Sequence, residues 1–303
     1  MQPRQTEAPT VEVSVLIVSH NCVDALRDCL SSLAQSKERE KIEVMVVDNG
    51  SSDGCQRIDD EFPEITALRL PHHCGLTKAR NIGMRTAKGE YLLLLAPDVM
   101  VEPGTVMRLM ERLKSDSSAL AVCPLLTDEN GAMVTNAFQL PDAAAVAAAW
   151  RDPATLPAAQ LDESIPVHDG KAIFVRKLTI QGINYFDGKY GEHWIDVDLA
   201  AQIRRVGKKI LLSHDIGARL NRKHRLWQPE STGDRAAFAA DAASGAARYL
   251  GKYFGFGASL GFRLKLILAT LLKTITFQDF SYNASLLSRV VSGSKIDGTS
   301  QQL

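Results

Sequence analysis

Three strongly apolar runs in the first hundred residues constrain the fold of this chain more than any other feature. They lie at 13–21 (VSVLIVSHN), at 42–54 (IEVMVVDNGSSDG, ending in a turn-rich loop) and at 91–98 (YLLLLAPD). Such runs are typical of strands buried on both faces of a parallel sheet. Segments with helical spacing follow or separate them, at 23–36, 76–89 and 103–115. Strands alternating with helices predict a doubly wound, mostly parallel α/β sheet.

The second half of the chain has a different character. Residues 141–164 are rich in Ala and Pro and predict a helix-bearing insertion or a mobile loop. Residues 171–177 predict a strand, and 195–210 a helix that runs from Asp198 with Leu199, Ile203 and Val206 on one face. The pattern is mostly helical from about residue 235. We expect a tail at 1–12, an α/β domain at 13–225 and a C-terminal helical region at 226–303.

Polar residues follow the apolar runs at the points where strands should end. Asn21, Asp48 and Asp98 are the three cases. Ligands bind at the carboxyl ends of strands in such sheets, so these side chains are expected to converge on one crevice. The alternative is that each caps the helix that follows it.

These residue types indicate a site for a nucleoside diphosphate. A carboxylate at Asp98 can hold a hard divalent cation, which would neutralise the charge of a leaving diphosphate. Asp48 can accept hydrogen bonds from a base or a ribose. Lys78 and Arg80 can meet phosphate oxygens, although a solvated helix face is the alternative.

Composition narrows the class of protein. Lys and Arg total 35, as do Asp and Glu, and zero net charge argues against a general nucleic-acid binder. Five cysteines, an odd number without a zinc-like spacing, favour reduced thiols in a cytoplasmic protein. The first dozen residues carry no apolar region typical of a signal peptide, and no apolar run approaches the roughly 18 residues of a spanning helix.

Four segments in this order resemble family 2 glycosyltransferases, especially the bacterial rhamnosyltransferase-like branch. They are VSVLIVSHNCVDALRDCLSSL, EVMVVDNGSSDG, GLTKARNIGMRTAKGEYLLLLAPDVMVEPG and IDVDLAAQIRRVGKKI. The resemblance covers roughly residues 13–225 and implies a GT-A fold that binds nucleotide-sugars. It also implies inverting sugar transfer with Mg²⁺ or Mn²⁺, to a saccharide or lipid-linked acceptor in cell-surface polysaccharide biosynthesis.

The resemblance assigns roles to individual residues. Asp196 matches the general base, and Asp98 the acid that meets the metal, with His214 near the metal and diphosphate. Arg222 and Lys223, in the basic run at 219–225, match a segment that closes over the diphosphate, and Asp198 is expected to cap its helix. The donor is expected to contact six polar residues, namely Ser19, Asn21, Asp48, Lys78, Arg80 and Asn81.

This chain departs from the family pattern at four places. Ala96 stands where Asp or Asn is usual, Ile195 replaces an acid before Asp196, and His73 replaces an amide. The stretch at 168–177 (HDGKAIFVRK) replaces small residues that often line the acceptor site. A non-catalytic nucleotide-sugar or glycan-binding module, or a scaffold, therefore remains the alternative to an enzyme. A nucleotidyltransferase is a weaker third hypothesis, because no Gly-rich loop follows the first strand.

The segment at 259–277 is apolar but interrupted by Arg263, Lys265 and Lys273, which argues against a spanning helix. Two alternatives stay open for it. It can lie in a membrane interface at the inner face of the cell membrane, or it can pack on the main domain or on the second subunit of a homodimer.

Overall fold

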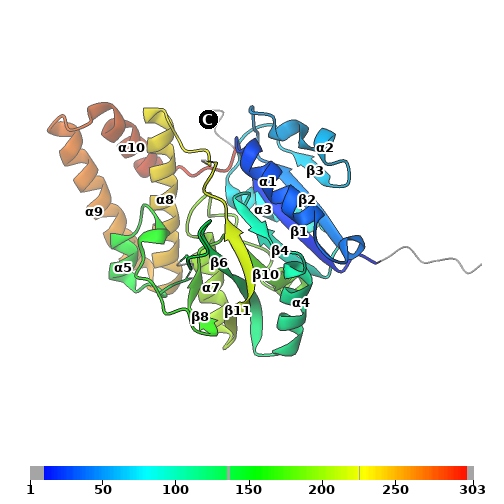
Figure 1. Cartoon of the computed structure of the whole chain (residues 1–303). Coiled ribbons are helices and arrows are strands. Elements are labelled where there is room, and N and C mark those ends of the chain that lie inside the picture. The colour runs from blue at the N-terminus through cyan, green and yellow to red at the C-terminus, as the bar shows by residue number, and fades with distance from the viewer. Residues whose placement is uncertain (1–9, 135–136, 225, 299–303) are drawn as a thin grey trace, which may run out of the picture.

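The computed structural model describes residues 10–134, 137–224 and 226–298 of the 303-residue chain (Figure 1). Its centre is a mixed sheet in the order β3-β2-β1-β4-β10-β6-β11-β5, with β8 paired to β11. The strands of this sheet are β1 Val13–Ser19, β2 Ile42–Asp48, β3 Thr66–Arg69, β4 Tyr91–Leu95, β5 Val99–Val101, β6 Ala119–Thr127, β8 Ser164–Ile165, β10 Ala172–Arg176 and β11 Lys209–Leu220. A small second sheet pairs β7 Ala137–Phe138 with β9 Val167–His168.

Helices cover both faces of the main sheet. Those of the α/β part are α1 Val23–Ala34, α2 Ile58–Glu61, α3 Leu76–Thr86, α4 Thr105–Ser115, α5 Ala143–Ala148, α6 Lys177–Gly182 and α7 Ile195–Arg205. The apolar runs supply both cores because successive side chains of a strand alternate between faces. Leu16 of β1 packs in the core with α3 and α7, whereas its neighbour Val15 packs in the core with α1 and α4.

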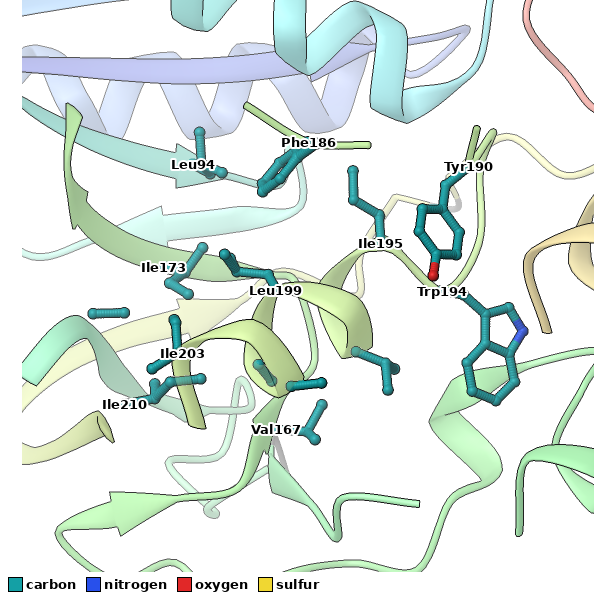
Figure 2. Close-up of a cluster of buried hydrophobic side chains, with 14 of the residues drawn as sticks. Leu94, Val167, Ile173, Phe186, Tyr190, Trp194, Ile195, Leu199, Ile203 and Ile210 are labelled. Carbon is teal, nitrogen blue, oxygen red and sulfur yellow. The ribbon is translucent and has the colours of Figure 1, made fainter. Parts of the chain in front are cut away.

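The core between the sheet and α7 holds this helix beside the carboxyl ends of the strands. Figure 2 shows Leu94 and Ile173 of the sheet facing Leu199 and Ile203 of α7. Trp194, at the N-cap position of this helix, is 2% exposed; its indole packs on Tyr249 of α8 and donates to the Trp150 carbonyl at 3.0 Å, which fixes the start of α7.

The predicted α/β fold with a C-terminal helical region is confirmed. Three antiparallel strands were not foreseen: β10 runs opposite to β4 and β6, and β5 and β8 run opposite to β11. Helix α3 ends at Thr86 rather than at Gly89. Gly89 instead abuts β1, where a Cβ atom would lie 2.5 Å from the backbone nitrogen of Ser14.

Asp198 does not cap α7, which corrects the prediction. The helix begins at Ile195 with Trp194 at the N-cap position, so Asp198 already lies inside it. Its buried carboxylate accepts hydrogen bonds from Lys252 Nζ at 2.7 and 2.9 Å, and this ion pair ties α7 to α8. Val206, expected on the apolar face, is 62% exposed because it follows the last helical turn.

Three long helices form the C-terminal region, α8 Thr232–Tyr253, α9 Phe256–Ile275 and α10 Phe280–Ser292. They stand together beside the sheet, and α5 of the insertion packs on α8 (Figure 1). After α10 the chain passes α8, where the Ile296 N–H donates to Asp241 Oδ1 at 2.9 Å, and reaches the α/β part, where Lys78 Nζ of α3 donates to the Asp297 carbonyl at 3.1 Å. No helix of the described residues is long and apolar enough to span a bilayer.

Candidate functional site

The predicted crevice lies where the carboxyl ends of β1, β2 and β4 meet, since these strands are parallel neighbours. Asp48 is the last residue of β2, and Asp98 follows β4 by three residues. Strand β10 is antiparallel to β4, so the residue that precedes it, Lys171, reaches the same edge of the sheet. The first turn of α7 adds Asp196.

Asp98 is paired with a lysine. Lys171 Nζ lies 2.5 Å from Asp98 Oδ2, and the two side chains are 30% and 9% exposed. The other oxygen, Asp98 Oδ1, is buried and accepts no hydrogen bond from the described residues. One carboxylate oxygen is therefore committed to an ammonium group, and the other keeps its lone pairs for a ligand.

Asp196 is held in a fixed orientation by α3 and by the turn before β10. Arg80 NH1 donates to Asp196 Oδ1 at 2.9 Å, and Arg80 NH2 donates to the Gly170 carbonyl at 3.0 Å. Gly170 has a φ of +75°, and a Cβ on it would lie 2.3 Å from Asp196 Oδ2. Only glycine therefore lets the backbone approach this carboxylate so closely.

A small pocket borders Asp196. It has a volume of about 140 Å³, and its wall includes Asp152 and Pro153 of the insertion, together with His168, Asp169 and Asp196. Burial raises the pKa of Asp169 to about 7. Burial lowers the pKa of His168 to about 4, so this imidazole is neutral at pH 7. The insertion thus forms one side of a polar pocket at the candidate base.

The expected nucleoside end of the site is built from the loops after β1 and β2. Asp48 is 3% exposed and its Oδ1 accepts from the Ser51 N–H at 3.1 Å. Asn21 has a φ of 46°, and its Oδ1 accepts from the Ser52 N–H at 2.8 Å, which joins the two loops. Ser19 Oγ is buried without a partner among the described residues.

Three residues of the predicted donor set have their side chains engaged elsewhere. Arg80 is buried and donates to Asp196 and to the Gly170 carbonyl, as described above. Asn81 is bound on both sides to the backbone of Phe186: its Nδ2 donates to the carbonyl at 2.9 Å, and its Oδ1 accepts from the N–H at 3.0 Å. Lys78 is exposed and donates one hydrogen bond, to the Asp297 carbonyl.

The structure does not bring His214 to Asp98. His214 is exposed, in a register shift of β11 between Ser213 and Gly217. The strand reaches Asp98 only at Asn221, whose N–H donates to the Asp98 carbonyl at 2.7 Å. Seven residues of extended chain, roughly 20 Å, separate the two positions. His224, three residues after Asn221, has its Nε2 atom 3.1 Å from Asp28 Oδ2.

The basic run after β11 does reach the edge of the crevice. Arg222 and Lys223 follow Asn221 directly and are exposed. The last residue of the predicted run, Arg225, lies outside the described residues, as does most of the predicted tail at 1–12. The run therefore starts directly after the residue that contacts the backbone of Asp98.

Sequence reasoning missed several residues of the site. Lys171, Asp169 and His168 were seen only as a stretch that departs from the family pattern, and no role was assigned to them. The pair of Glu192 and His73, with Glu192 Oε1 3.2 Å from His73 Nε2, was missed as well. Burial raises the pKa of Glu192 to about 7 and lowers that of His73 to about 3. The only signal in the sequence was the density of titratable residues at 168–171 and 192–196.

The oxygens present offer one protein ligand for a divalent cation, Asp98 Oδ1, which is buried without a partner among the described residues. Ala96 provides no second carboxylate, and in the described part of the chain no three His, Cys, Asp or Glu side chains converge on a metal position. A cation shared with a bound diphosphate fits this donor set, because the diphosphate would supply further oxygens. A metal site built only from protein side chains does not fit this donor set.

Comparisons with known proteins agree with this geometry. The model of the family described as Glycosyl transferase family 2 matches residues 14–177. The N-acetylglucosaminyl-diphospho-decaprenol L-rhamnosyltransferase of Mycobacterium tuberculosis is 25% identical over 224 residues, which are 64% of this chain and 70% of that protein. Glycosyltransferase GlyA of Streptococcus pneumoniae is 29% identical over 37% of this chain and 16% of its own length. The chain spans a third or less of the length of GlyA and of EpsH and YfnE of Bacillus subtilis.

Solved structures establish the GT-A fold. GalNAc-T7 with UDP, GalNAc and Mn²⁺ has a TM-score of 0.57 at 18% identity, over 78% of this chain and 51% of that one. Staphylococcus aureus TarS 1–349 in complex with UDP-GlcNAc has a TM-score of 0.53 at 16% identity, over 93% and 91%. At such identities the likeness concerns the fold, so the roles of individual residues must be argued from the site itself.

Proposed function

This chain belongs to glycosyl transferase family 2, and on that basis we propose that it is an inverting, metal-dependent glycosyltransferase. It would transfer a sugar from a nucleotide-sugar donor to a saccharide or lipid-linked acceptor during the assembly of cell-surface polysaccharide. The observation that carries the proposal is the pairing of Asp196 with Arg80 beside a pocket, at the sheet edge that also holds Asp48 and Asp98.

Asp196 is proposed to be the general base. Its described hydrogen bonds all use Oδ1, so Oδ2 is the oxygen left to accept the proton of an acceptor hydroxyl. The guanidinium of Arg80 fixes the direction of this carboxylate through their hydrogen bond. That hydroxyl would attack the anomeric carbon from the side opposite the diphosphate, which inverts the configuration.

Asp48, Ser19 and Asn21 are proposed to bind the nucleoside part of the donor. Asp98 would hold a divalent cation through Oδ1, and Arg222 and Lys223 would close over the diphosphate. When bound, Mg²⁺ or Mn²⁺ would neutralise charge that develops on the leaving diphosphate. Lys78 would add the N–H donors that its bond to the Asp297 carbonyl leaves unused.

Donor hydrolysis and transfer test this proposal. Wild-type protein with nucleotide-sugars and Mn²⁺ should release nucleoside diphosphate, and Asp196→Asn should lower the rate by about 10²–10⁴. Release that is unaffected by Asp196→Asn in a folded variant would remove Asp196 as the base.

A non-catalytic binding module is the second candidate. It is favoured by Ala96 and by the ion pair that occupies one oxygen of Asp98. Such a protein would bind a nucleotide-sugar but release no product at any metal concentration. Binding by calorimetry together with the absence of turnover over long incubation would establish this reading.

Contact with a membrane surface is proposed for α9. Six exposed apolar side chains fall within roughly one third of the circumference of this helix, and the exposed Phe256 at its first residue lies just outside that arc. The six are Leu260, Leu264, Leu268, Leu271, Leu272 and Ile275. Arg263 and Lys265 flank them, and α9 carries no acidic residue, which suits an anionic lipid surface. An apolar groove of about 580 Å³ between α5, α8 and α9 lies beside them and favours a lipid-linked acceptor.

Vesicle binding distinguishes membrane contact by α9 from a dimer interface. Leu268→Glu should abolish sedimentation with anionic vesicles, whereas Leu178→Glu, at a 75% exposed leucine of α6, should not. If Leu268→Glu instead converts a dimer to a monomer without any vesicle binding by the wild type, the face is a subunit interface.

A further inference from the structure

We propose that the ammonium group of Lys171 is a built-in cation of the donor site, which binds the donor diphosphate and stabilises it as the leaving group. This inference rests on the proposed glycosyltransferase function and adds a catalytic residue to it. It implies that part of the binding free energy of the donor does not depend on a divalent metal.

The backbone places Lys171 directly opposite the position where an acid is missing. The Ala96 N–H donates to the Lys171 carbonyl at 2.7 Å, which extends the antiparallel pairing of Ala172 with Leu95 by one residue. This hydrogen bond brings the backbone of Lys171 beside Ala96, two residues before Asp98.

The geometry leaves the ammonium group available to a ligand. Its one described contact is with Asp98 Oδ2 at 2.5 Å. An ammonium has three N–H donors, so two remain for phosphate oxygens. The lysine side chain is 30% exposed while Asp98 is 9% exposed, so the carboxylate anchors the cation from the protein side.

The other basic side chains near this edge have different contacts or positions from Lys171, and Arg222 and Lys223 follow β11 and are exposed. Arg80 donates to Asp196 and to the Gly170 carbonyl, and Lys78 donates to the Asp297 carbonyl. A diphosphate that enters beside Asp98 would meet carboxylates first, and Lys171 is the cation in contact with them. An isolated carboxylate would repel the ligand, whereas the pair presents a charge-assisted donor.

The reaction step is balanced as follows. The bond between the anomeric carbon and the diphosphate oxygen breaks, and its electron pair stays on that oxygen. A bond forms between the acceptor oxygen and the anomeric carbon, and the acceptor proton moves to Asp196. Lys171 keeps its protons throughout and donates a hydrogen bond to the diphosphate, so it stabilises the charge without being consumed.

Calorimetric binding of UDP, GDP and dTDP tests the inference, in EDTA and in Mn²⁺. Wild-type protein should bind one of them in EDTA, and Lys171→Met should weaken that binding by roughly 10- to 100-fold. In Mn²⁺ the same change should cost less, since the metal supplies positive charge. Lys171→Arg should restore part of the binding, and Lys88→Met, which removes a 74% exposed lysine before β4 at the opposite edge of the sheet, should have no effect.

Asp98→Asn gives a second test, because it should change the affinity for the nucleotide in opposite directions in Mn²⁺ and in EDTA. In Mn²⁺ the variant should bind the nucleotide more weakly, because a metal ligand is lost. In EDTA it should bind more tightly, because Lys171 is freed from its counter-ion. The gain should disappear in the double variant Asp98→Asn/Lys171→Met, which separates the released lysine from mere loss of negative charge.

Each outcome decides one proposal. Equal binding by wild type and Lys171→Met in EDTA, with both melting at the same temperature, overturns the role of Lys171. Binding by the wild type only in Mn²⁺ also overturns it, yet leaves the glycosyltransferase proposal intact. Failure of the wild type to bind any nucleoside diphosphate or nucleotide-sugar in either condition contradicts the proposed function itself.

Discussion

Replacing Gly170 with alanine should disable the candidate base while leaving the fold largely intact. The new Cβ would lie 2.3 Å from Asp196 Oδ2, and atoms at this distance must separate to at least 3.0 Å. The carboxylate therefore has to retreat by about 0.7 Å or more, which strains its bond to Arg80. Misplacement of a catalytic group by about 1 Å costs up to 10²-fold in rate, so we expect kcat to fall by about 10- to 100-fold.

A matched variant isolates this effect from backbone strain. Gly131 has a φ of +79°, and no atom lies within 4 Å of the position that a Cβ would take there, so Gly131→Ala carries the same strain without the clash. Each substitution should cost about 1–2 kcal/mol in urea unfolding, because alanine is disfavoured at positive φ. Turnover should fall only in Gly170→Ala. If that variant is folded and keeps wild-type kcat, the contact between Gly170 and Asp196 has no bearing on catalysis.

Three further predictions concern Asp196, His168 and the ion pair of Lys252 with Asp198. Asp196→Asn should leave nucleotide binding within about twofold of wild type while turnover drops, since the base acts only in the chemical step. The pKa of His168 is held near 4 by burial, so only the unfolded chain gains a proton below pH 6.5, and stability should fall as the pH drops. Urea unfolding should show a loss of about 2 kcal/mol between pH 7 and 5 that His168→Gln removes. Lys252→Met should cost about 3 kcal/mol by leaving the Asp198 carboxylate buried without its cation, and a second change, Asp198→Asn, should recover most of it in thermal melts.

The sequence was informative where apolar residues cluster within one short segment. The runs that became β1, β2 and β4 are apolar on both faces, and that pattern is enough to predict a sheet covered by helices on each side. The ends of these runs correctly located Asp48 and Asp98 at one edge. The Ala-rich insertion was also predicted to carry a helix, which is α5.

The parts that could not be predicted depend on contacts between distant segments. No local pattern states that β10 runs antiparallel to β4, and that direction is what brings Lys171 to Asp98. The pairing of Arg80 with Asp196 joins positions 116 residues apart. His214 was misplaced because β11 continues for 12 residues through a register shift, and spacing along a sequence does not reveal how far a strand extends.

The return of the chain after α10 also sets the order in which the site can form during synthesis. His72 Nε2 contacts the carbonyl of Gly298, a residue made 226 positions later, so the loop before α3 acquires this support only after Gly298 has been made. Contacts between such distant positions are slow to form and leave the earlier segment exposed in the meantime. A ribosome-bound chain that stops before residue 293 would present a nearly complete sheet, but the loop before α3 would lack the contact of His72 with Gly298.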